Sequence, residues 1–220
     1  MVSGRVRVVG NELAAVGRTA WWLPSRLLER DRAFDPNVAH PTPVVFVHGF
    51  CGDHTNFRAI ERRLGARGVA NVAYFDYRPR LDWPRLATRL GHEIDALRAK
   101  TGARRVDVVG HSLGGLVARY LVEMRGDVPV RRLVTLASPY AGARLAANEL
   151  AVYGAHDPIV TPPHPAYGPH ATGGRVVVAD CGHWGVLVDE LTVREVGRFL
   201  TSPDLALTHG RYEHLLDRAC

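Results

Sequence analysis

The segment 105-RVDVVGHSLGGLVARY-120 decides the fold of this chain. Its valine-rich start, residues 105–109, predicts a short buried strand, and residues 113–124 have the pattern of a helix. Between them, Gly110 and Gly114 flank Ser112 in the pattern G-x-S-x-G. In this context the serine occupies a sharp turn that projects its hydroxyl above the sheet, and the glycines let strand and helix backbones pass close together. The helix N-terminus stabilises negative charge that develops there. The segment therefore predicts a nucleophilic serine.

Strand and helix patterns alternate on both sides of this segment. Apolar runs predict further strands at 43–47, 70–77, 132–137, 150–153 and 175–179, and periodic stretches predict helices at 55–67, 82–100 and 184–199. Strands that alternate with helices form a mostly parallel sheet with right-handed crossovers and helices on both faces. The predicted fold class is therefore α/β, as a single domain with a central sheet of about six strands.

A serine hydroxyl needs a base, and in this kind of site the acid and then the histidine follow the serine along the chain. His183 comes directly after the last predicted strand, and we expect it to be the base. Asp157 follows the strand before that one and is the expected acid, which would orient the imidazole and stabilise its charged form. Two other aspartates are weaker candidates: Asp180 is only three residues from the histidine, and Asp189 falls within the predicted last helix.

The tetrahedral intermediate of such a reaction requires backbone N–H donors for its oxyanion. The amide of Leu113, the residue after the nucleophile, is one expected donor. The other is the amide of Phe50, in the loop that follows the first core strand, where Gly49 lets the chain come close to Ser112. His48 in the same loop is an alternative base, but we expect it to brace the loop by hydrogen bonding.

Composition describes an ordinary globular protein, because 46% of its 220 residues are hydrophobic and 23% are charged. The net charge of +6 is spread along the chain, so no nucleic-acid partner is expected. The three cysteines, Cys51, Cys181 and Cys220, form no zinc-binding or disulfide framework and favour a reducing compartment. A bond between the first two stays open, because both are expected in loops at the same end of the sheet.

The ends of the chain differ from its centre, and we divide it into an N-terminal helical extension (1–41), a catalytic domain (42–201) and a C-terminal tail (202–220). In the extension, Trp21 and Trp22 lie on an apolar face flanked by arginines. We expect this face to pack on the domain, with peripheral contact to a membrane or lipid surface as the alternative. No apolar run suits a membrane span or an ordinary signal peptide, so a cytoplasmic protein is expected unless a leader has been removed.

These motifs together resemble the α/β-hydrolase superfamily and, within it, the small bacterial lipases and esterases. The resemblance rests on VVFVHGFCGDHTNF at 44–57, the segment at 105–120, VTLASPYAG at 134–142, VYGAHDPIV at 152–160 and CGHWGVL at 181–187. It implies hydrolysis of acyl esters or lipids through an acyl-enzyme, without a metal or organic cofactor. The triad would be Ser112, Asp157 and His183, with Phe50 and Leu113 as the oxyanion donors.

Members of this family often carry a lid between the strand after the nucleophile and the acid. Residues 138–149 leave room for about a dozen residues there, so we expect a minimal lid or none and an open site. From loop positions, His48, Tyr140 and Trp184 are the expected pocket residues. Two alternatives remain: a thioesterase or acyltransferase with the same triad, and a non-catalytic binding protein of the same fold. The natural substrate, its acyl-chain length and the oligomeric state are not predicted.

Overall fold

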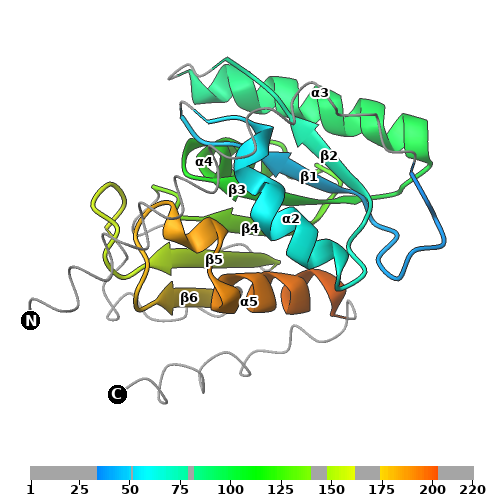
Figure 1. The fold of residues 1–220 in the computed structure, drawn as a ribbon. Coiled ribbons are helices and arrows are strands. Elements are labelled where there is room, and N and C mark those ends of the chain that lie inside the picture. The colour runs from blue at the N-terminus through cyan, green and yellow to red at the C-terminus, as the bar shows by residue number, and fades with distance from the viewer. Residues whose placement is uncertain (1–33, 51, 79–81, 140–147, 162–173, 203–220) are drawn as a thin grey trace, which may run out of the picture.

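A six-stranded, wholly parallel sheet forms the centre of the protein in the computed structural model (Figure 1). The structure describes residues 34–50, 52–78, 82–139, 148–161 and 174–202. Along the sheet the strand order is β2-β1-β3-β4-β5-β6. The strands are β1 (Val44–Val47), β2 (Val72–Phe75), β3 (Val106–His111), β4 (Val130–Leu136), β5 (Glu149–Gly154) and β6 (Gly174–Val178). The predicted α/β fold class is therefore confirmed.

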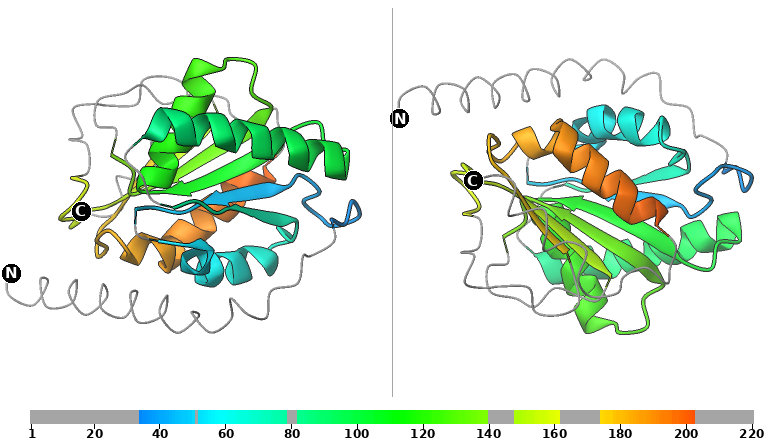
Figure 2. Two further views of the ribbon diagram at one scale, coloured as in Figure 1. Left: turned by 90° about the horizontal axis from the view of Figure 1, so that it is seen from above. Right: turned by 90° about the horizontal axis from the view of Figure 1, so that it is seen from below.

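Helices cover both faces of the sheet (Figure 2). One face carries α2 (Arg58–Gly65) and α5 (Glu190–Thr201), and the other carries α3 (Trp83–Thr101) and α4 (Leu113–Met124). The two larger hydrophobic cores form because each face of the sheet buries apolar side chains against its own pair of helices. Phe46, Leu64 and Val196 belong to the first core, and Val45 and Leu90 belong to the second.

Successive strands are added to the sheet on opposite sides of β1. The chain runs from β1 outward to β2, returns past β1 to β3, and then continues through β4, β5 and β6 in the opposite direction. In open α/β sheets, ligands bind outside the carboxyl ends of the strands at such a switch point. The switch lies between β1 and β3, which lead directly into His48 and Ser112, respectively. Topology alone therefore indicates where a site should lie.

Two of the predicted helices differ from those observed. The predicted helix at 55–67 is a 3-10 turn, η2 (His54–Phe57), followed by α2, which ends at Gly65. The predicted helix at 184–199 is also interrupted: η3 (Gly185–Leu187) precedes α5, which begins only at Glu190. The expectation that Asp189 lies within the last helix was therefore wrong. Its carboxylate caps the N-terminus of α5 by accepting a hydrogen bond from the amide of Thr192 at 3.0 Å. An N-cap residue lies just before the first helical residue, so the helix cannot extend back through Asp189.

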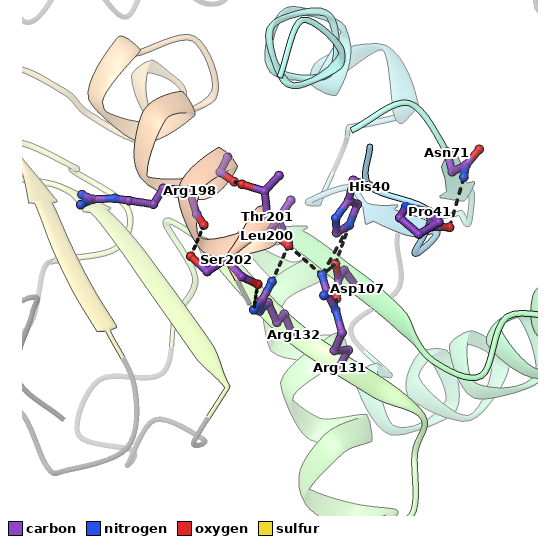
Figure 3. A network of polar contacts seen from close by, with 11 residues as sticks. His40, Pro41, Asn71, Asp107, Arg131, Arg132, Arg198, Leu200, Thr201 and Ser202 are labelled. Atoms are coloured by element: carbon purple, nitrogen blue, oxygen red, sulfur yellow. Dashed lines mark hydrogen bonds and ion pairs between the residues drawn. The ribbon is translucent and has the colours of Figure 1, made fainter. Parts of the chain in front are cut away.

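A buried polar network joins the amino ends of β3 and β4 to the C-terminus of α5 (Figure 3). The guanidinium of Arg131 binds both carboxylate oxygens of Asp107, at 2.9 and 2.6 Å, and Nε2 of His40 approaches the same carboxylate at 3.0 Å. Arg131 also donates to the carbonyl of Leu200 at 2.7 Å, and Arg132 donates to the same carbonyl. The fully buried carboxylate is thus compensated by a bidentate partner, as burial of a charge requires. This His–Asp contact lies at the opposite end of β3 from Ser112, so we assign it a structural role.

Several predictions fall outside the described residues. These are the helical extension with Trp21 and Trp22, most of the C-terminal tail, Cys51 with its open pairing to Cys181, and most of the short segment that replaces a lid. Within the described residues, no helix has the length and apolar character needed to cross a membrane.

Candidate active site

Ser112 lies at the turn between β3 and α4, in a backbone conformation that non-glycine residues rarely adopt. Its φ and ψ are 52° and −121°, and its side chain makes no capping hydrogen bond to the helix. Such a conformation costs on the order of 1–3 kcal/mol and persists only where the surrounding structure enforces it. The amide of Ser112 is fixed by the carbonyl of Leu136 at 2.8 Å, and its carbonyl accepts from Gly115 and Leu116. The strain therefore belongs to a rigid turn at the carboxyl end of the sheet.

Close backbone approaches explain the glycines of the motif. A Cβ atom on Gly110 would lie 2.5 Å from Cα of Gly115, and one on Gly114 would lie 2.0 Å from the carbonyl oxygen of Val47. Real Cβ atoms essentially never make contacts this short. The predicted close passage of strand and helix is thus present, and α4 also lies directly against the end of β1. Gly115, which follows the motif, is close to a side chain instead, since a Cβ there would meet Oγ of Ser138 at 1.9 Å.

Asp157 and His183, 26 residues apart in the sequence, meet beyond the carboxyl ends of β5 and β6. Nδ1 of His183 lies 2.8 Å from Oδ2 of Asp157, and both side chains are buried. The other carboxylate oxygen, Oδ1, accepts from the amides of Ile159 and Val160 at 2.7 and 2.8 Å. The carboxylate is therefore fixed on both sides and orients Nδ1–H, which leaves Nε2 of the imidazole as the proton acceptor.

The loop after β1 packs against Ser112 and is braced from behind. A Cβ on Gly49 would lie 3.0 Å from Cβ of Ser112, so the loop approaches the serine as closely as a residue without a side chain permits. The ring of His48 stacks on Tyr77 at 4.1 Å, donates from Nδ1 to the carbonyl of Gly49 at 2.9 Å, and accepts at Nε2 from the amide of Tyr77 at 3.3 Å. Burial lowers the pKa of His48, so the ring is neutral and acts as a brace.

Phe50 and Leu113 carry the two amides expected to bind an oxyanion. Leu113 is the first residue of α4, where the N–H has no intrahelical acceptor. Phe50 follows Gly49 in the loop that lies against Ser112, and 49% of its side chain is exposed. Both amides therefore belong to backbone segments that flank the serine.

His111 is a site residue that the sequence analysis missed. Its ring is buried beside the rings of His183 at 4.9 Å and Trp184 at 5.2 Å, and its Nε2 donates to the carbonyl of His183 at 3.0 Å. Burial and the neighbouring His183 lower the pKa of His111 to about 3. The neutral ring of His111, which directly precedes Ser112, thus connects the nucleophile turn to the loop that carries His183. The sequence signal that could have indicated a role for His111 is its position inside the G-x-S-x-G motif, directly before Ser112.

Acid should destabilise the fold through His111. Its pKa in the folded protein lies below its value of about 6.5 in the unfolded chain, so the unfolded state binds the extra proton. The stabilisation is complete above about pH 6.5 and is lost at about 1.4 kcal/mol per unit as the pH falls toward the folded pKa. The free energy of unfolding can be measured by urea denaturation at several pH values between about 7 and 4.5. Plotted against pH, it should fall less steeply for His111→Gln than for the wild type, by about 1.4 kcal/mol per pH unit.

A matched control for this measurement is His92→Gln, because His92 is an exposed histidine on α3. The control should keep the pH dependence of the wild-type protein. If His111→Gln has the same slope as the wild type, the neutral buried ring assigned to His111 is wrong.

The predicted pocket residues have different outcomes. His48 lines a cavity of about 670 Å³ beside the loop after β1. Trp184 packs edge-on against His183, with ring centroids 5.8 Å apart, whereas Tyr140 lies outside the described residues. The part of the chain that the structure describes contains no cluster of three or more His, Cys, Asp or Glu side chains suited to a metal ion.

Comparisons with known proteins agree with this fold. A family model described as the alpha/beta hydrolase fold matches residues 42–150. A triacylglycerol lipase of Pseudomonas fragi is 30% identical over 117 residues, which are 51% of this chain and 39% of that protein. An sn-1-specific diacylglycerol lipase of Mus musculus is 31% identical over 100 residues, or 44% of this chain and 33% of the relative. Among solved structures, Aspergillus fumigatus lipase B superimposes with a TM-score of 0.63 at 14% identity, covering 79% of this chain and 56% of that chain.

The sheet topology and the family model agree on the class of fold: the chain has the fold of the α/β-hydrolases. The two curated relatives that it resembles are lipases. The matches span only 39% and 33% of the length of these two curated relatives.

Proposed function

We propose that this protein hydrolyses carboxylic esters through an acyl-enzyme on Ser112, with His183 as the base and Asp157 as the orienting acid. The observation that carries the proposal is the 2.8 Å contact between Nδ1 of His183 and Oδ2 of Asp157. It occurs at the same end of the sheet as the strained serine. The ring of His111, the residue before Ser112, forms a hydrogen bond with the carbonyl of His183. The lipase relatives support the same class of reaction.

The reaction would proceed in two steps. Oγ of Ser112 attacks the ester carbonyl while Nε2 of His183 takes its proton, and the amides of Phe50 and Leu113 stabilise the oxyanion. The tetrahedral intermediate collapses as the bond to the alcohol breaks, and the imidazolium protonates the departing alcohol. Water then attacks the acyl-enzyme by the same route and regenerates the serine.

Hydrolysis of p-nitrophenyl esters of graded acyl-chain length tests this proposal. The folded wild-type protein should release p-nitrophenol, and the dependence on chain length should separate a short-chain esterase from a lipase. A folded protein that hydrolyses no ester of any length would contradict the proposed function. It would favour a thioesterase, an acyltransferase or a binding protein of the same fold.

The acid is tested separately by Asp157→Asn. The amide can no longer hold the His183 tautomer that the reaction needs, so kcat should fall by about 10⁴-fold. Because the backbone amides of Ile159 and Val160 can still donate to the remaining carbonyl oxygen, the loop should keep its shape. Steady-state kinetics with p-nitrophenyl butyrate provide the measurement.

The matched control is Asp180→Asn, at the aspartate closest in sequence to the base. It should change kcat by less than about threefold, since an aspartate outside the triad contributes no orientation to His183. A larger loss of kcat in Asp180→Asn than in Asp157→Asn would overturn the assignment of the acid.

A further inference from the structure

A charged cavity adjoins the proposed active site without including its triad. It has a volume of about 670 Å³ and lies at the carboxyl ends of β1 and β2, against the first turns of α3. His48 and Tyr77, the stacked pair behind the loop after β1, form part of its wall. Because Gly49 of the same loop lies against Ser112, the loop contacts the serine through Gly49 and the cavity through His48.

The carboxylates of the cavity wall already have local partners. Asp53 accepts from the amide of Thr55 at 2.7 Å and caps η2. Asp82 accepts from the amide of Arg85 at 3.2 Å and caps α3. Asp76 lies 3.1 Å from Nδ1 of His54. Helix capping and this contact with His54 give each of the three carboxylates a partner within the protein.

The three arginines of the same wall have no such explanation. Within the described residues, Arg78, Arg85 and Arg89 are exposed, and their guanidinium groups form no ion pair with a carboxylate. Arg89 lies over the ring of Phe75 at 5.4 Å, which orients its guanidinium and leaves its N–H donors available. Each guanidinium can bind a phosphate or carboxylate with two parallel hydrogen bonds.

The placement of two of these arginines opposes helix stability. Arg85 is the third residue of α3, at the positive end of the helix dipole, where a cation is unfavourable. Arg89 follows four residues later on the same face, and like charges at this spacing repel each other. Both terms are small at the surface, and an anion between the two guanidinium groups outweighs them because it attracts both cations and the helix N-terminus. Apart from the contact of Arg89 with the ring of Phe75, the described residues offer these two guanidinium groups no attractive partner.

We propose that this cavity binds a phosphate carried by the alcohol portion of the ester substrate, as in a glycerophospholipid. The inference rests on the proposed function, because it places the ester carbonyl at Ser112 and the phosphate on the other side of the loop formed by His48 and Gly49. Arg85 and Arg89 bind the phosphate oxygens, and Arg78 adds positive charge at the rim. The cavity thereby selects phosphate-bearing esters over neutral ones.

Binding is measured first, without turnover, on Ser112→Ala by titration calorimetry. The probes are sn-glycerol 3-phosphate, glycerol and inorganic phosphate. Glycerol 3-phosphate should bind more tightly than glycerol, and adding Arg85→Gln and Arg89→Gln should weaken its binding by about tenfold per arginine. The control replaces two exposed arginines elsewhere, Arg62→Gln with Arg105→Gln, and should leave binding unchanged at equal net charge.

Selectivity is measured next, by comparing kcat/KM for dihexanoyl phosphatidic acid and dihexanoyl glycerol below their micellar concentrations. The wild-type protein should prefer the phosphate-bearing ester, and Arg85→Gln/Arg89→Gln should lose that preference mainly through KM. The same double variant should hydrolyse p-nitrophenyl butyrate at the wild-type rate, because neither arginine contacts the reacting atoms.

The outcomes separate this proposal from the proposed function. Hydrolysis of both esters at equal rates by the wild type would overturn the phosphate site and leave the ester hydrolase intact, as would an equal loss of binding in the control variant. Tight binding of inorganic phosphate without any preference between esters would show a site for a free anion, which also overturns the proposal. Arginine-dependent binding of glycerol 3-phosphate by a protein that hydrolyses no ester would support the anion site and contradict the proposed function.

Discussion

Replacing Ser112 by alanine should lower kcat for p-nitrophenyl esters by about 10⁵-fold or more, with little change in KM. The hydroxyl is the proposed nucleophile, and without it the base and the orienting acid have no proton to transfer. The side chain of Ser112 makes no capping hydrogen bond, so its loss should leave the turn intact. Steady-state kinetics and a urea denaturation curve on the same preparations provide the measurement. A variant that retains most of its activity would remove Ser112 as the nucleophile.

Ser112→Gly provides a second, independent readout. Glycine adopts a φ of 52° without the steric cost that serine or alanine incurs there, so this variant should be inactive yet more stable than the wild type by about 1 kcal/mol. Ser112→Ala should have nearly wild-type stability, because alanine has the same Cβ. An inactive glycine variant with increased stability would indicate that the turn stores strain for the reaction. A loss of stability in Ser112→Gly would contradict that interpretation.

The sheet was predictable because its signals are local. Buried parallel strands appear as short runs of valine, leucine and isoleucine, and the intervening helices repeat their apolar residues at helical spacing. The boundaries were less accurate where a polar side chain sets them. Asp189 is the N-cap of α5, where its carboxylate accepts from the amide of Thr192, and the apolar pattern of residues 184–199 did not reveal this break.

Contacts between distant residues were beyond the reach of the sequence pattern. Asp107 is the second residue of the valine-rich strand β3, yet it is compensated by Arg131 and His40, which are 24 and 67 residues away. The arginines of the cavity are similar: Arg78 follows β2 whereas Arg85 and Arg89 belong to α3, and only the fold brings them to one wall. The triad candidates were found because chain order in this kind of site is fixed, a constraint that neither of these groups provides.

Gly114→Ala should destabilise the protein more than a methyl group added at any other glycine of the site. We expect the free energy of unfolding to fall by about 3 kcal/mol or more. The new Cβ would lie 2.0 Å from the carbonyl oxygen of Val47 and 2.5 Å from that of His48, and both are backbone atoms that cannot rotate away. Helix α4 must therefore move off β1. That movement separates Ser112 from the loop that carries Phe50, and a displacement of about 1 Å costs about 100-fold in rate. Urea denaturation and ester hydrolysis should both show the loss.

The control for this substitution is Gly65→Ala at the exposed end of α2, where an added Cβ meets no atom within 4 Å. Alanine is the better helix former, so this variant should be as stable as the wild type or up to about 1 kcal/mol more stable, with unchanged activity. If Gly114→Ala kept both its denaturation midpoint and its activity, the close approach of α4 to β1 would be wrong. The position of the oxyanion loop beside Ser112 depends on that same approach, so the proposed function would lose its geometric basis with it.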